Sequence, residues 1–72
     1  MIYLKYVGMD CWGREIFVDA ENIKYVNVAI CGGEKNIFAL GYALLHEDGV
    51  WEGEPDYPIR EEWRIVEEFV QE

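Results

Sequence analysis

The chain contains no serine and no threonine. Hydroxyl nucleophiles of the kind used by many hydrolases and transferases are therefore excluded. One histidine, His46, and two cysteines, Cys11 and Cys31, remain for nucleophilic or thiol chemistry. A dyad of His46 with either cysteine is conceivable, but no local motif supports it, and 72 residues leave little room for a substrate cleft. We therefore expect no catalytic residue and no enzymatic activity.

The small number of histidine and cysteine residues also argues against a metal site or a cofactor site. Cys11, Cys31 and His46 could join a carboxylate as four ligands, but no two of them have the close spacing of structural zinc sites. The acidic stretch 47–56 does not match the calcium-loop pattern. The pair Gly32-Gly33 lacks the Lys-Ser/Thr ending of a phosphate loop and is interpreted as a turn. We predict no metal site and no cofactor.

Long apolar runs are also missing. No segment approaches the roughly 18–20 apolar residues of a membrane span, and no charged start followed by an apolar stretch suggests a signal peptide. Cys11 and Cys31 form no C-x-x-C motif, so we interpret them as small buried hydrophobic residues of a reduced, cytoplasmic protein. A disulfide between them is the alternative.

Positive charge is scarce, and the negative charge is unevenly placed. The net charge is −9; residues 1–46 contribute −1 and residues 47–72 contribute −8. Phosphate backbones repel such a surface, so direct nucleic-acid binding is not expected, whereas a protein with a basic surface is a plausible partner. The 51% hydrophobic and 15% aromatic content nevertheless predicts an ordered single domain over residues 1–72.

Alternating β-forming residues in the first half predict a sheet, placed mainly in residues 1–46. Strands are expected at Ile2–Val7, Arg14–Val18 and Ile23–Ile30, the last two as an antiparallel hairpin. The segment 37–46 fits both a strand and a helix, and Gly41 in its middle favours the strand.

The acidic C-terminal part predicts a loop and a helix. Residues 47–58 are expected to form an acidic loop, with Pro58 near the start of a helix at 59–71. Apolar residues recur there at helical spacing, namely Ile59, Trp63, Val66 and Val70. The expected fold class is α+β: a small antiparallel sheet of three to five strands with one C-terminal amphipathic helix on one face. The expected core is Leu4, Tyr6, Ile16, Val18, Val26, Val28, Phe38, Leu40, Trp63, Val66 and Val70.

Two motifs resemble a family of short proteins from phages and mobile elements of Gram-positive bacteria, related to domains within large polyvalent proteins. The first runs from Tyr6 to Arg14 (YVGMDCWGR) and the second from Gly53 to Ile59 (GEPDYPI). The stretch Cys31–Trp51 is longer than the family pattern, and the residues after Ile59 extend beyond it. The family has no assigned activity, so the resemblance implies a mobile-element accessory protein and supplies no catalytic residue.

These observations predict a non-enzymatic protein-interaction module of a phage or mobile element. The alternative is a mimic of nucleic acid that inhibits a host defence or nucleic-acid-processing enzyme, and acidity that serves only solubility also stays open. The candidate interaction surface lies in the acidic loop and on the helix exterior: Trp51, Glu52, Glu54, Asp56, Tyr57, Glu61, Arg64 and Glu68.

Overall fold

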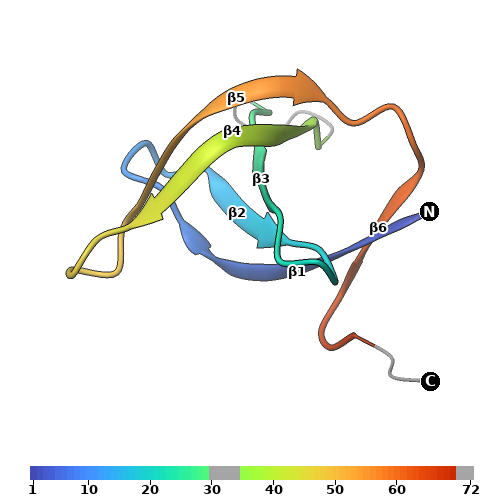
Figure 1. Cartoon of the computed structure of the whole chain (residues 1–72), viewed down its shortest axis with the longest axis horizontal. Helices are drawn as coiled ribbons and strands as arrows, with labels where there is room; N and C mark the ends of the chain where they lie inside the picture. Colours follow the sequence, from blue (N-terminus) through green and yellow to red (C-terminus); the bar gives the residue numbers. More distant parts are fainter. Residues whose placement is uncertain (30–34, 70–72) are drawn as a thin grey trace.

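The computed structural model describes residues 1–29 and 35–69, in which six strands form a single sheet and no helix occurs (Figure 1). The strands are β1 (Ile2–Met9), β2 (Glu15–Val18), β3 (Lys24–Asn27), β4 (Ile37–Leu45), β5 (Trp51–Pro58) and β6 (Trp63–Val66). Their order is β5-β4-β3-β2-β1-β6, with β1 and β6 parallel and all other neighbours antiparallel. The described chain is therefore all-β with a mixed sheet, and the α+β prediction is wrong.

The predicted helix at 59–71 is the main error, and its last residues lie outside the described ones. Ile2–Lys5 of β1 pairs instead with Trp63–Val66 of β6, and the Ile2 amide donates to the Glu62 carbonyl at 2.8 Å. Trp63 and Ile65 pack against the core, whereas Arg64 between them is exposed. The segment thus uses a period of two, because the open edge of β1 offers it a full ladder of hydrogen bonds.

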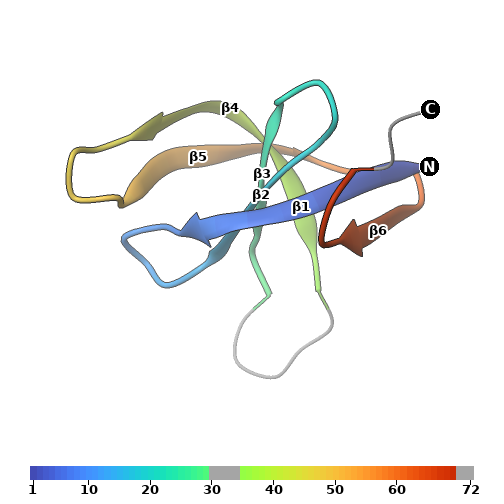
Figure 2. The same ribbon diagram turned by 90° about the horizontal axis from the view of Figure 1, so that it is seen from below.

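The predicted acidic loop at 47–58 is also mostly a strand. Only the turn between His46 and Val50 separates β4 from β5, and the two strands form a long hairpin that extends from the rest of the sheet (Figure 2). Two bulges interrupt their pairing, one on each side of Leu40. β5 tolerates Pro55 because it lies at the edge of the strand order, where a missing N–H breaks few ladder bonds.

The first four strands follow the sequence predictions within a few residues. β1, β2 and β3 lie inside or overlap the expected segments, and the antiparallel β2–β3 hairpin is confirmed by the pair Val18 and Lys24. The choice of a strand over a helix for 37–46 is confirmed by β4. The predicted turn at Gly32-Gly33, like Cys31, lies outside the described residues.

The core lies on both faces of β2 and β3, so three consecutive residues of each strand are buried. One face carries a cluster of Leu4, Phe17, Tyr25, Ile37 and Ala39, covered by Ile2, Ile59, Trp63 and Ile65. The other face carries Ile16, Val18 and Val26. Each large apolar side chain buried in this way contributes about 1.5–3 kcal/mol.

The predicted core is correct in part. Leu4, Ile16, Val18 and Val26 are buried, but Tyr6 is 48% exposed, and Phe17, Tyr25, Ile37 and Ala39 were not anticipated. The remaining expected positions are half-buried, with Val70 outside the described residues: Val28, Phe38, Leu40, Trp63 and Val66.

Trp51 closes the curled sheet at its open side. An isolated parallel bridge joins it to Asp10, so the start of β5 meets the end of β1. Gly8, at a bulge in β1 with φ of 154°, lies where a Cβ would approach the Trp51 indole at 3.3 Å. The Lys24 ammonium lies 5.4 Å from the indole centroid on that same face. Glycine at position 8 therefore gives the indole the space it needs beside β1.

A hydrogen bond at the β2–β3 turn fixes a buried tyrosine. The Tyr25 hydroxyl donates to Asp19 Oδ2 at 2.8 Å, while the other carboxylate oxygen accepts from the Glu21 and Ile23 amides. Burial, and then this bond to a carboxylate, raise the pKa of Tyr25 well above its ordinary value. The folded state therefore holds the phenolic proton more tightly than the unfolded chain does.

This proton linkage predicts an alkaline loss of stability. The contribution of Tyr25 is complete below the unfolded tyrosine pKa of about 10 and falls as the pH rises above it, because the unfolded state then carries fewer protons. Tyr25→Phe should flatten this part of the curve of unfolding free energy against pH, measured by urea denaturation. Tyr3→Phe, at an exposed tyrosine, keeps the Tyr25–Asp19 pair and should keep the fall. Equal slopes for the two variants would contradict the assignment.

The β4–β5 hairpin requires glycine at position 53 of β5 and tolerates alanine at position 41 of β4. A Cβ at Gly53 would collide with the Tyr42 carbonyl oxygen, whereas a Cβ at Gly41 would make ordinary contacts with Asp56 at 3.7 Å. Gly53→Ala should lower the free energy of unfolding by about 1–3 kcal/mol, as overpacking does. Gly41→Ala should change it by less than about 1 kcal/mol. Urea denaturation of both variants checks this, and equal losses would contradict it.

Candidate functional site

The turn between β1 and β2 is built around a buried carboxylate. Asp10 is 7% exposed, and its Oδ1 accepts hydrogen bonds from the Trp12 amide at 2.9 Å and the Arg14 amide at 2.7 Å. Its Oδ2 accepts from Arg14 Nε at 2.6 Å. The main chain closes the turn as well, since the Asp10 amide donates to the Arg14 carbonyl. One side chain thus fixes the whole turn.

This turn presents a tryptophan to solvent. Trp12 is 82% exposed, more than any other large hydrophobic residue in the described part of the chain. Cys11 beside it is a free, exposed thiol, so the prediction that it is a buried hydrophobic residue is wrong. An exposed indole on a turn held by three hydrogen bonds has no role in the core.

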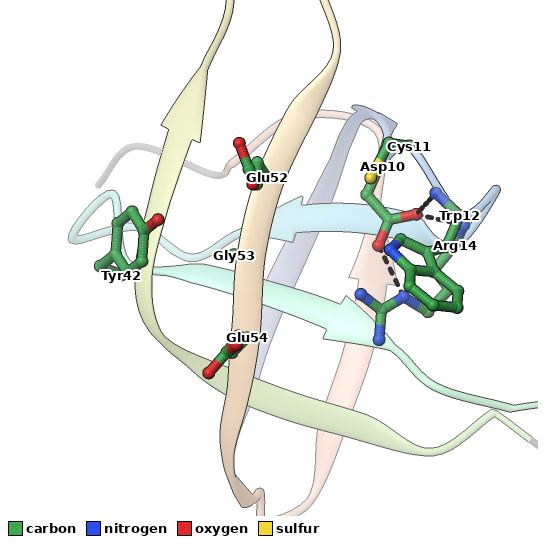
Figure 3. A pocket seen from close by; sticks show the side chains of 8 residues that line it. All are labelled: Asp10, Cys11, Trp12, Arg14, Tyr42, Glu52, Gly53 and Glu54. Atoms are coloured by element: carbon green, nitrogen blue, oxygen red, sulfur yellow. Dashed lines mark hydrogen bonds and ion pairs between the residues drawn. The ribbon is translucent and has the colours of Figure 1, made fainter.

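A pocket of about 170 Å³ lies between this turn and β5. In Figure 3 the Trp12 and Arg14 side chains lie at the turn, beside β5, and Glu52 and Glu54 extend from that strand. Tyr42 contributes from β4. The pocket brings together the first and last thirds of the sequence.

The pocket has a surplus of negative charge. Arg14 is paired with Asp10, which leaves Glu52 and Glu54 as uncompensated carboxylates at the lining. Glu52 also contacts His46, with Nε2 and Oε2 2.6 Å apart at the outer end of the hairpin. No ion pair or hydrogen bond to the Glu54 side chain is found within the described residues.

The residues of the predicted interaction surface are only partly gathered. Four of them are exposed along β5, namely Glu52, Glu54, Asp56 and Tyr57. Trp51, at the start of the same strand, is half-buried. Glu61 is exposed in the connection to β6. Arg64 and Glu68 belong to the opposite end of the strand order, where Glu68 pairs with Lys5 at 3.3 Å. The helix exterior that was expected to join them does not exist.

Asp10, Trp12 and Arg14 were missed as site residues. The sequence signal was present, because an aspartate two residues before a tryptophan and ahead of Gly13 is typical of a side-chain-capped turn. A tryptophan in such a turn has no strand position through which to reach the core. The proximity of this turn to Glu52 and Glu54 could not be predicted from the sequence, because it depends on the curvature of the sheet.

Other chemistry receives no support from the described residues. Across 1–29 and 35–69, no group of three histidine, cysteine, aspartate or glutamate side chains is placed to hold a metal ion. Over the same ranges there is no helix with the length and apolar character needed to cross a membrane. The chain matches no protein-family model, no curated protein and no solved structure.

The carboxylate of Asp10 should matter far more than an ordinary turn aspartate. Asp10→Asn removes the charge that accepts three hydrogen bonds and should lower the free energy of unfolding by about 1.5–3 kcal/mol. Asp48→Asn is the matched control, since Asp48 is exposed and accepts a single bond from the Val50 amide. It should cost less than about 0.5 kcal/mol. Urea denaturation measures both, and equal losses would contradict the central role of Asp10.

Proposed function

We propose that this chain is a non-enzymatic protein-interaction module of a phage or mobile element, and that its partner carries a basic surface. The observation that carries the proposal is the 82% exposure of Trp12 on a turn that Asp10 holds rigid. Tryptophan is among the residues most enriched at the energetic centres of protein interfaces. A turn already fixed before binding loses little conformational entropy when the partner arrives.

The charge along β5 supports a basic partner. Glu52, Glu54 and Asp56 occupy alternate positions of an edge strand, and all three are exposed. Trp12 and the first two of these acids line the same pocket. An apolar anchor with acids around it fits a partner whose lysine and arginine side chains surround an apolar patch. The resemblance of the two sequence motifs to a mobile-element family supports the biological setting.

The second candidate is a mimic of nucleic acid that occupies the basic groove of a host enzyme. The row of acids on β5 favours it, because alternate residues of a strand repeat at about 7 Å and form a line of negative charge. Trp12 beside this row has no counterpart in a phosphate backbone. For that reason the interaction module is the preferred proposal.

Partner capture with matched variants tests both candidates. The immobilised parent should retain a basic protein from a lysate of a Gram-positive host, and Trp12→Ala and the Glu52→Lys/Glu54→Lys double variant should lose that protein. Glu21→Lys changes an exposed acid on the β2–β3 turn and should retain it. Retention by all variants alike would contradict the proposal. Release of the captured protein by duplex DNA would favour the mimic, since DNA would then compete for the same basic groove.

A further inference from the structure

The far end of the β4–β5 hairpin exposes apolar side chains that take no part in the core. Tyr42, Leu44 and Leu45 lie close together in β4 and are 55%, 50% and 58% exposed. This part of the hairpin extends from the rest of the sheet (Figure 2). Exposed apolar side chains that gather on one element are typical of a surface that another molecule covers.

The two faces of this part of the hairpin differ in charge. Leu44 pairs with Glu52 and Leu45 pairs with Trp51, so the two neighbouring leucines lie on opposite faces. His46 follows Leu44 by two residues, and its Nε2 lies 2.6 Å from Glu52 Oε2, in agreement with this placement. The face that carries Leu44 therefore combines apolar and acidic side chains, whereas Leu45 shares its face with Trp51.

The apolar and acidic side chains of the Leu44 face are near enough for one segment to contact both. In a cross-strand pair such as Leu44 and Glu52 the Cβ atoms are about 4.5–5.5 Å apart. Tyr42 and Glu54 lie two residues farther along β4 and β5 from the turn. In Figure 3, Tyr42, Glu52 and Glu54 all lie on the side of β5 away from Trp12. An apolar column on β4 thus runs beside an acidic column on β5.

The charge of the hairpin determines which molecule can cover this face. Residues 37–58 contain five acids and no lysine or arginine. A second copy of the chain would bring the same negative charge to the face, and the two copies would repel each other. Lysine or arginine side chains would be attracted by Glu52 and Glu54. Glu54 has no ion pair within the described residues, so its carboxylate is available to a partner.

We propose that a basic amphipathic segment of the partner protein docks on the Leu44 face of the hairpin. Apolar side chains of the segment cover Tyr42 and Leu44, and its lysine or arginine side chains pair with Glu52 and Glu54. This inference rests on the proposed interaction function and names the surface on which the acids of β5 act. Trp12 lies on the other side of β5 and is not part of this surface.

Synthetic peptides test the surface without knowledge of the partner. A capped peptide of alternating lysine and leucine, titrated into ¹⁵N-labelled protein, should shift the Leu44 and Glu52 amide signals in a saturable way. A lysine–serine peptide of the same length lacks the apolar side chains and should bind at least about tenfold more weakly. A glutamate–leucine peptide should show no saturable binding, because its charge is reversed. Equal binding of the lysine–leucine peptide and either of the other two would overturn the proposal.

Two neighbouring leucines locate the apolar contact. Leu44→Ser should weaken binding of the lysine–leucine peptide by about fivefold or more, because it removes an apolar side chain from the docking face. Leu45→Ser makes the same change at a residue of similar exposure on the opposite face and should bind like the parent. The ¹⁵N spectrum of each variant verifies that the fold is kept. Equal weakening by both substitutions would overturn the assignment to the Leu44 face.

Two double variants of equal net charge locate the ionic contact. Glu52→Gln/Glu54→Gln should weaken binding of the lysine–leucine peptide by about fivefold or more, because both acids of the face lose their charge. Glu21→Gln/Glu61→Gln removes the same charge from exposed positions outside the hairpin and should bind nearly like the parent. Equal binding by the two double variants would show attraction to net charge alone and would overturn the docking surface.

Sedimentation velocity tests the alternative occupant. The protein alone should sediment as a monomer, because the hairpin carries charge of one sign. A dimer that Leu44→Ser dissociates would assign the face to a second copy of the chain and would overturn the basic segment as its occupant.

The failure of this proposal can be told apart from failure of the proposed function. If the lysine–leucine peptide does not bind but Trp12→Ala still loses the captured protein, the interaction module stands and the hairpin surface is wrong. If the peptide binds at the Leu44 face and the captured protein is retained by every variant of the capture experiment, the hairpin surface is correct and the proposed function is wrong.

Discussion

The packing of Trp51 against Gly8 is the contact on which the rest of the structure depends. It joins the start of β5 to the end of β1, which pairs with β2 through Gly8 and Ile16. The Phe17–Tyr25 face of the two central strands is covered by Ile59, Trp63 and Ile65, which follow β5 in the chain. A chain of 72 residues buries a limited part of its surface, and several of its large apolar side chains stay exposed, among them Tyr6, Trp12 and Leu45. The same closure brings Glu52 and Glu54 beside the Trp12 turn.

The first four strands could be predicted from the sequence because the alternation of apolar residues along a strand is a local signal. The prediction failed in the C-terminal segment, where tertiary contacts decide between helical and strand spacing of the apolar residues. Trp63 and Val66 are three residues apart and satisfy a helix, but Trp63 and Ile65 are two apart and satisfy a strand. Such a short apolar segment cannot discriminate by itself; the free edge of β1 did. Phe17 and Tyr25 were missed for a related reason. Alternation assigns them to the face opposite Val26, and only the return of the C-terminal segment buries that face.

Local hydrogen bonds form one part of the candidate site, and contacts between residues far apart in the sequence form the other. The Asp10 turn is local, since its hydrogen bonds span at most four residues. The pattern Asp-x-Trp-Gly-Arg is therefore sufficient to predict this turn. The acids on β5 were predicted to form an interaction surface together with Arg64 and Glu68, which lie in β6 and after it, at the other end of the strand order. The grouping by sequence proximity failed because a helix was assumed where the chain crosses to pair with β1.

The acids of β5 have a second physical role that must be separated from binding. An edge strand exposes unpaired backbone groups, and charges or prolines along it oppose pairing with another chain. Glu52, Glu54, Pro55 and Asp56 all serve that purpose. Protection of the edge depends on the total charge along the strand, so an acid at one position can replace an acid at another. Binding in a pocket depends on position, because only side chains that reach the lining of the pocket contact a ligand. Glu54 lines the pocket and Asp56 does not, so the two physical roles place different demands on these two positions.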